Sequence, residues 1–147
     1  MISRRYPSGQ IGLAIFLLDV YCLGVKDVFY QLVDPSKYIQ IMEGLERDGP
    51  LEDIDPACAR KLIEGAIEYA QRFQLRPHPA YRAAQKILDG VDAAACLRSF
   101  EYGRDGKPFY VAGPNDSPAK SRQVLSLLEQ QCGPEGFHYI IGSELTP

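Results

Sequence analysis

The sequence lacks the features that mark most membrane proteins and many metal enzymes. Its longest apolar stretch, residues 11–18, contains eight apolar or glycine residues before Asp19, far fewer than the roughly 18 to 20 that a membrane span needs. Only two histidines are present, His78 and His138, which excludes a histidine-rich metal site and leaves a Ser or Cys nucleophile few bases. P-loop, dinucleotide-binding, zinc-protease and calcium-loop motifs are absent. We therefore expect no membrane partner. None of these motifs indicates a particular catalytic reaction.

Cysteine pairs at metal-binding or redox spacing are also missing. The four cysteines Cys22, Cys58, Cys96 and Cys132 form no C-x-x-C pair and share no surrounding pattern, which argues against a zinc site, a repeat and a disulfide framework. We expect reduced, mostly buried thiols that pack as small hydrophobic residues. The basic N-terminal residues precede an apolar run without a small-residue cleavage site, so no signal peptide is expected and the prediction is a cytoplasmic protein.

Residues 11–26, I-G-L-A-I-F-L-L-D-V-Y-C-L-G-V-K, contain the stretch around which the fold is expected to form. An unbroken apolar run of this kind is typical of a strand buried on both faces, at the centre of a sheet. The turn signal P-S-G-Q before it predicts that residues 2–6 form an antiparallel partner. A second apolar run, residues 28–33, predicts the neighbour on the other side, with the bend at Gly24.

Helical spacing of apolar residues predicts four helices. The first covers residues 36–47, and the clearest begins with Asp55 as N-cap and Pro56 as the first helical residue. A third is expected over residues 79–88, and a fourth opens at Ser117 and Pro118 and stops before Gly133. A short strand over residues 137–141 follows the last helix.

Residues 100–111, F-E-Y-G-R-D-G-K-P-F-Y-V, place two aromatic-rich arms around Asp105 and Gly106. Asp-Gly between such arms predicts a β-hairpin, and Pro108 assigns its second arm to a sheet edge. Strands and helices therefore cluster along the chain instead of alternating. This order predicts one globular domain over residues 1–147, of α+β class, with a largely antiparallel sheet covered by about four helices. A ribonuclease-H-like fold is the alternative, because three antiparallel strands followed by a helix also open that fold.

Polar residues attached to the central strand are the first candidates for chemistry. Asp19 and Asp27 could hold Mg²⁺ as the paired carboxylates of nucleases do, with Glu101 or Asp105 as a third ligand. We favour the alternative in which Asp19 pairs with Lys26 or caps the turn that follows it. The sequence therefore predicts no cofactor, with Mg²⁺ as the alternative.

Two further candidates lie in the second half of the chain. Asp105 and Lys107 match the D-x-K half of a restriction-nuclease motif, but they coincide with the predicted hairpin turn. His138 alternates with aromatic residues on a strand, where a hydrogen-bonded histidine is favoured over a catalytic one.

The charges are distributed unevenly although the net charge is only −3. Residues 43–55 contain six acids and one base, whereas residues 72–107 contain seven bases and four acids. Basic residues at i, i+4 spacing on helices could line a strip beside aromatic rings and bind single-stranded nucleic acid. The residues of this predicted strip are Arg72, Arg76, Arg82, Lys86, Tyr102 and Phe109. The pI of about 5.4 argues against a dedicated nucleic-acid binder, and a solvated helix face is the alternative.

Several segments together resemble a family of small bacterial proteins to which we can assign no activity. They are F-L-L-D-V-Y-C-L-G-V-K-D, P-H-P-A-Y, G-R-D-G-K-P-F-Y and G-F-H-Y-I-I, and the resemblance covers most of the chain. It supplies no catalytic residue. Members of that family begin further upstream of the central strand, so the resemblance implies a chain shortened at its N-terminus.

The functional prediction is a non-catalytic binding or accessory module of a bacterial assembly. It would act through protein–protein contacts, with nucleic acid as a further partner. The alternative is a metal-dependent nuclease or phosphodiesterase.

Overall fold

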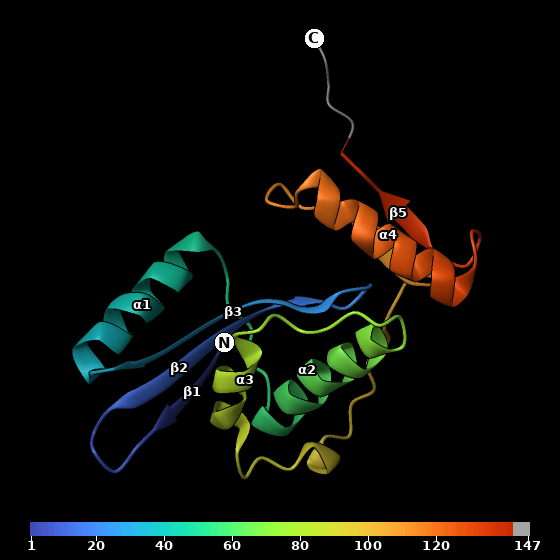
Figure 1. Ribbon diagram of the computed structural model, residues 1–147. Helices are drawn as coiled ribbons and strands as arrows, with labels where there is room; N and C mark the ends of the chain where they lie inside the picture. The colour runs from blue at the N-terminus through green and yellow to red at the C-terminus, as the bar shows by residue number, and fades with distance from the viewer. Residues whose placement is uncertain (143–147) are drawn as a thin grey trace.

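The computed structural model describes residues 1–142 and contains a three-stranded antiparallel sheet (Figure 1). Its strands are β1 (Ile2–Arg5), β2 (Ile11–Asp19) and β3 (Gly24–Val33), in the order β1-β2-β3. The strand predicted to be central is therefore central, and a strand lies on each side of it as predicted. β3 begins at Gly24, where the bend was expected, and not at residue 28. The first residues of β2 are fully buried, whereas Leu17 near its end is exposed, so burial on both faces holds only for the first half of the strand.

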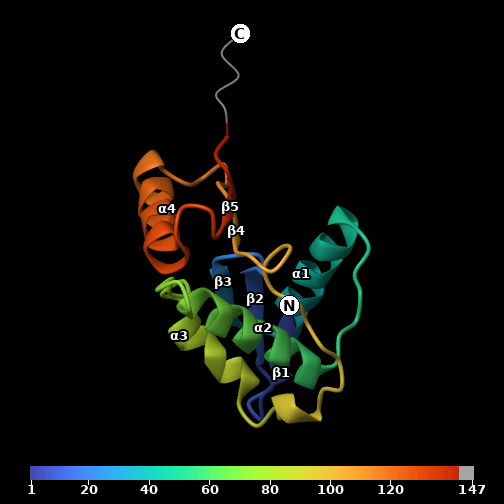
Figure 2. The ribbon, with the colours of Figure 1, turned by 90° about the vertical axis from the view of Figure 1, so that its right-hand side faces the viewer.

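Helices lie on both faces of this sheet (Figures 1 and 2). The long helix α2 (Pro56–Gln71) and the short α3 (Tyr81–Ala84) cover one face, and α1 (Pro35–Asp48) lies over the other. The main core lies between β2, β3 and the α2 layer, and its buried residues are Ala14, Val25, Val28, Ile63, Ile67, Ala84, Ile87 and Leu88. By contrast, α1 has no buried residue. The α2 side of the sheet is therefore the main source of hydrophobic stabilisation.

The helix starts follow from local capping. The side chain of Asp55 accepts a hydrogen bond from the backbone N–H of Ala57, and Ser117 does the same for Lys120 at the start of α4 (Pro118–Cys132). In both helices proline occupies the first turn, where its missing N–H costs nothing. These predicted starts are confirmed because they depend only on neighbouring residues.

The third predicted helix is shorter than expected. Residues 79–88 form the single α-helical turn α3 and then a 3₁₀ turn, η1 (Gln85–Leu88). The residue before α3, Ala80, offers no side-chain cap. The segment is held instead by tertiary contacts, with Ala84, Ile87 and Leu88 buried in the main core.

The predicted hairpin at residues 100–111 is wrong. Only its turn forms, as an isolated bridge between Arg104 and Lys107. The second arm becomes β4 (Phe109–Val111), which pairs in parallel with β5 (His138–Ile140) instead of antiparallel with the first arm. The first arm forms no strand because Tyr102 packs on α2, where its hydroxyl donates to the backbone carbonyl of Leu62 at 3.1 Å.

The parallel pair β4-β5 is separate from the antiparallel sheet, so the architecture is α+β without a clear ribonuclease-H-like fold. With α4 it forms a C-terminal part that lies beyond the turn between β2 and β3 (Figure 1). A second core joins this part to the end of α2, and its buried residues are Cys22, Leu23, Ala70, Leu75, Tyr110, Val124 and Leu128.

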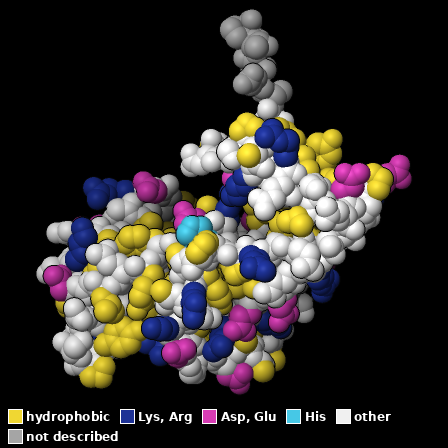
Figure 3. Space-filling model, viewed as in Figure 1, with side chains coloured by type: hydrophobic (Ala, Val, Ile, Leu, Met, Phe, Trp, Pro, Cys, Tyr) yellow, Lys and Arg dark blue, Asp and Glu magenta, His cyan; other side chains and the backbone are white. Residues whose placement is uncertain are grey.

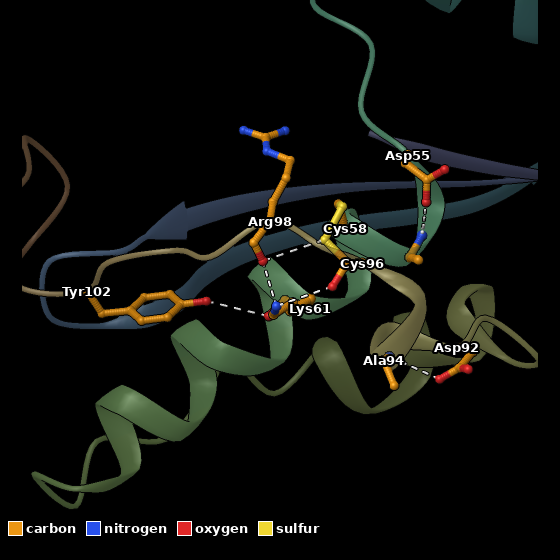
Figure 4. Close-up of a disulfide and its surroundings, with 9 residues drawn as sticks. Asp55, Cys58, Lys61, Asp92, Ala94, Cys96, Arg98 and Tyr102 are labelled. Carbon is orange, nitrogen blue, oxygen red and sulfur yellow. Dashed lines mark hydrogen bonds between the residues drawn. A yellow bond between two sulfur atoms is a disulfide. The ribbon is translucent and has the colours of Figure 1, made fainter.

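A disulfide between Cys58 and Cys96 contradicts the prediction that all four thiols are reduced (Figure 4). The two Cα atoms lie 4.9 Å apart, and the bond ties the first turn of α2 to the segment after the short 3₁₀ turn η2 (Ala93–Ala95). The Lys61 ammonium donates to the carbonyl oxygens of Cys96 and Arg98 beside it, at 3.4 and 2.5 Å. The prediction of four free thiols was wrong because it used only the residues around each cysteine. The pairing depends instead on the path of residues 72–95, which brings Cys96 back to the first turn of α2.

The other two cysteines are free thiols in the described part of the chain. Burial, followed by the nearby carboxylate of Asp19, raises the pKa of the Cys22 thiol to about 12. Cys22 is therefore a packing residue and not a nucleophile at neutral pH.

No helix among residues 1–142 combines the length and apolar character needed to cross a membrane.

Candidate binding cleft

A cleft of about 470 Å³ lies where the C-terminal part meets the sheet. Three elements form its walls: the start of β3, the loop of residues 74–79 after α2, and one face of α4. Its polar lining includes Lys26, Arg76, His78 and Lys120, and its apolar lining consists of Leu23, Val25, Leu75, Pro77, Pro79, Val124 and Leu127. Figure 3 shows Lys and Arg side chains beside hydrophobic ones where the two parts adjoin. This volume lies within the range of small-ligand and peptide side-chain pockets.

A buried carboxylate, Asp116, connects two of these walls, β3 and α4. Its side chain is only 3% exposed, and it lies 3.0 Å from the ammonium of Lys120 and 3.6 Å from that of Lys26. It also accepts hydrogen bonds from the backbone N–H of Gly113 at 2.8 Å and from the Tyr110 hydroxyl at 3.3 Å. Asp116 thereby fixes Lys26 of β3 and Lys120 of α4 on the same side of the cleft.

Burial alone would raise the pKa of Asp116, because it disfavours the charged carboxylate. The hydrogen bond from Gly113 and the ammonium groups of Lys120 and Lys26 outweigh burial and hold the pKa of Asp116 below its ordinary value. The carboxylate is therefore charged at neutral pH. Each lysine ammonium has three N–H donors, so both lysines keep donors for a ligand.

The loop that supplies Arg76 and His78 is held by backbone geometry. Gln74 adopts a positive φ of 62°, and the next N–H, that of Leu75, donates to the carbonyl of Ala70 at 3.1 Å. This is the Schellman arrangement that ends many helices, with glutamine in the place where glycine is usual. Leu75 and Ala70 are both buried in the second core, which supports the strained residue.

The loop then docks on β3 through His78. Its backbone N–H donates to the carbonyl of Val25 at 2.9 Å, and its Nδ1 accepts from the N–H of Ala80 at 3.1 Å. With Nδ1 occupied as an acceptor, the neutral ring carries its proton on Nε2, which lies 3.7 Å from Asp27. Nε2 therefore faces Asp27, while His78 remains one of the residues that line the cleft.

Comparison of the chain with protein-family models, curated proteins and solved structures finds no match. The resemblance to a family of small bacterial proteins stays a prediction.

The structure assigns Asp19 to the turn after β2. Its two carboxylate oxygens accept hydrogen bonds from the backbone N–H groups of Tyr21, Cys22 and Leu23, at 3.0, 3.2 and 3.0 Å. The favoured interpretation, a turn cap, is confirmed, whereas the pairing with Lys26 is not found. Lys26 contacts Asp116 instead.

The remaining acidic candidates do not gather around Asp19. Asp27 is exposed within β3, and its side chain accepts a hydrogen bond from the N–H of Val28. Glu101 and Asp105 are exposed as well, and Asp105 has a positive φ of 54° in the turn. Among residues 1–142 no three His, Cys, Asp or Glu side chains form a group that could hold a metal ion.

Lys107 and His138 lie near the β4-β5 pair. The Lys107 ammonium donates to the carbonyl of Glu135 at 2.8 Å. His138 is exposed on β5, with its ring 6.3 Å from that of Phe109. Phe109 also lies beneath the guanidinium of Arg104, so these residues form a separate surface cluster outside the cleft.

The predicted basic strip is divided by the fold. α2 ends at Gln71, so Arg72 and Arg76 do not share a helix face; Arg72 lies over the ring of Tyr69, and Arg76 lines the cleft. Arg82 and Lys86 are exposed on α3 and η1. Nucleic-acid binding by these residues stays a prediction. Tyr102 offers little for it, because its ring stacks on Tyr69 and its hydroxyl is bonded to α2.

Two residues that line the cleft, Lys26 and Arg76, were candidates from the sequence, whereas Lys120 and its partner Asp116 were not. The only local signal was the segment P-N-D-S-P, in which a turn precedes the N-cap of α4. Asp116 and Lys120 are also at i, i+4 spacing, which places the two side chains within reach. The third partner, Lys26, is far away in sequence, and only the docking of α4 on β3 brings it to Asp116.

Proposed function

We propose that the protein is a non-catalytic binding module whose cleft takes an acidic, aliphatic segment of a partner protein. The observation that carries the proposal is a surplus of positive charge above an apolar floor. Lys26, Arg76 and Lys120 line the cleft, and within residues 1–142 the two lysines pair with a single carboxylate, that of Asp116. Two positive charges therefore remain for an anionic ligand, and charge-assisted hydrogen bonds to a carboxylate would use them.

The floor of the cleft favours peptide over nucleic acid. Its apolar residues are leucine, valine and proline, and it contains no Phe, Tyr or Trp. Proteins that bind single-stranded nucleic acid stack the bases on aromatic rings, whereas aliphatic walls suit Leu, Ile or Val side chains of a peptide. A glutamate or aspartate next to an aliphatic residue fits both features of this cleft.

A charge reversal in the cleft tests the proposal. The Arg76 side chain forms no hydrogen bond or salt bridge within the described residues, so Arg76→Glu changes the charge of the cleft without breaking the Asp116 network. Arg82→Glu is the matched control, because it makes the same change on an exposed residue outside the cleft. With a short labelled peptide of glutamate and leucine as probe, fluorescence anisotropy should show binding that Arg76→Glu weakens about tenfold or more and Arg82→Glu leaves within about twofold.

Two further probes separate the alternatives. A lysine and leucine peptide should bind more weakly than the glutamate peptide. A single-stranded oligonucleotide that binds more tightly than either peptide would overturn the proposal and favour the nucleic-acid prediction. In that case log affinity should fall with log salt at a slope of roughly −0.7 per phosphate contact.

The disulfide bears on where such a module would work. The sequence predicts a cytoplasmic protein because no signal peptide is expected, but one pair of cysteines is bonded. Disulfides persist mainly in oxidising compartments, so we propose that the chain matures in one. Thiol labelling of the protein isolated from its native cells and denatured without reductant, so that the buried Cys22 is accessible, should modify two cysteines; four labelled cysteines would favour the cytoplasmic location.

A further inference from the structure

The outer edge of β5 is an unpaired strand edge. β5 uses the N–H of His138 and the C=O of Ile140 to bond β4, to the carbonyl of Pro108 and the N–H of Ala112 respectively, both at 2.9 Å. Because N–H and C=O groups of successive strand residues point to opposite sides, the backbone of Tyr139 and Ile141 points away from β4. No described residue forms a strand on that side.

Large apolar side chains surround this edge. Tyr139, Ile140 and Ile141 are 56, 54 and 47% exposed, and Val111 on β4 is 44% exposed. A parallel sheet normally has more strands and is covered on both faces, and an isolated pair of strands is marginally stable in water. Within residues 1–142, the pair β4-β5 therefore has no third strand, and several of its apolar side chains are exposed to solvent.

The edge also lacks the features that usually prevent an exposed edge strand from pairing with another chain. Proteins protect such edges with lysine, proline or inward-pointing charges. Residues 137–142, F-H-Y-I-I-G, contain no formally charged side chain and no proline. An edge without charge has nothing with which to select a partner of complementary charge, but it can meet an identical edge without like-charge repulsion.

We propose that a second copy of this chain pairs along β5, antiparallel and about a two-fold axis. The axis passes beside Ile140, so that Tyr139 of one copy lies opposite Ile141 of the other, and the reverse. This register uses the outward N–H and C=O groups of both residues. It also makes two aromatic to β-branched cross-strand pairs, which are among the favourable ones. The result is a four-stranded sheet, β4-β5-β5-β4, with an isologous interface.

The dimer should be weak. The contact involves a three-residue strand and its neighbours, and stable interfaces bury at least about 1,000 Å² in total. Sedimentation velocity of the full chain should therefore show a monomer at low concentration and a dimer at high concentration.

Ile141→Pro is the discriminating variant. It removes the outward N–H of Ile141 without touching a bond to β4, and proline disposes the residue before it, Ile140, to extended backbone. The variant should stay monomeric at concentrations where the wild type is a dimer. Leu97→Lys, at a residue 97% exposed elsewhere on the surface, is the control and should dimerise like the wild type.

Amide hydrogen exchange of the wild type tests the same contact without a substitution. The N–H groups of Tyr139 and Ile141 should be protected at high concentration and lose that protection on dilution, while the N–H of His138 stays protected at both. A wild type that is monomeric at all concentrations overturns the proposal. So does a dimer that survives Ile141→Pro, or one in which Tyr139 and Ile141 exchange freely and another surface is protected.

Discussion

At the scale of single residues, Asp116 is the side chain on which the cleft depends. It is buried, contacts two ammonium groups and accepts a backbone hydrogen bond. Removing one partner of a buried ion pair is costly because the remaining charges lose their compensation. Since Asp116 positions Lys26 and Lys120 together, its loss would affect the cleft as well as stability.

We expect Asp116→Asn to lower the free energy of unfolding by about 1 to 3 kcal/mol at neutral pH. The pKa of Asp116 is lower in the folded protein than its ordinary value of 3.8. Its contribution to stability is therefore fully present above about pH 4, and it is lost as the pH falls through the folded pKa. Urea unfolding between pH 7 and pH 3 measures this. In Asp116→Asn, the loss of stability that follows protonation of Asp116 in the wild type should be absent. Identical dependence of the unfolding free energy on pH in variant and wild type would contradict a stabilising, ionised Asp116.

At the scale of elements, α2 is the helix that stabilises the sheet, and α1 contributes little. Ile67 is 8% exposed and lies in the main core, whereas Ile39 on α1 is 55% exposed. We expect Ile67→Ala to cost about 2 to 5 kcal/mol, because it leaves a cavity between α2 and β3. Ile39→Ala is the matched control and should cost less than about 0.5 kcal/mol. Chemical denaturation compares the two. Equal losses would mean that the two helices contribute alike.

The elements also show which predictions the sequence can support. The starts of α2 and α4 were predictable because a capping side chain and a proline lie within a few residues of each other. The antiparallel strands were predictable because a short turn joins each pair. The parallel pairing of β4 with β5 was not, since residues 112–137 separate the two strands and the Asp105-Gly106 turn favoured a hairpin.

The same distinction applies to the candidate site. The cap formed by Asp19 follows from its own turn, and it was among the expected alternatives. The cleft depends on Lys26, Arg76 and Lys120, which come from three distant segments. No local sequence pattern relates residues from distant segments. Single residues of the cleft could therefore be predicted from the sequence, but their arrangement around one cleft could not.

At the scale of the whole molecule, the disulfide closes the chain between α2 and the connector to β4. It links residues 38 positions apart, and chain-entropy arguments assign such a loop about 3 to 4 kcal/mol. Reduction should therefore lower the melting temperature by roughly 6 to 15 °C. Calorimetry with and without reductant measures the change, and Cys58→Ser should match the reduced wild type. Cys132→Ser, at a free thiol, is the control and should still respond to reductant. A melting temperature that reductant leaves unchanged would restore the prediction of free thiols.

The central claim is that the cleft between β3, residues 74–79 and α4 binds an acidic, aliphatic peptide. The most direct measurement is an NMR titration of the labelled wild type with the glutamate and leucine peptide, followed at backbone amides and at the His78 ring. The account predicts the largest shift changes at Lys26, residues 74–79 and residues 120–127, with small changes at Arg82 and Lys86. Changes confined to Arg82, Lys86 and the β4-β5 region, or no change at saturating peptide, would contradict it.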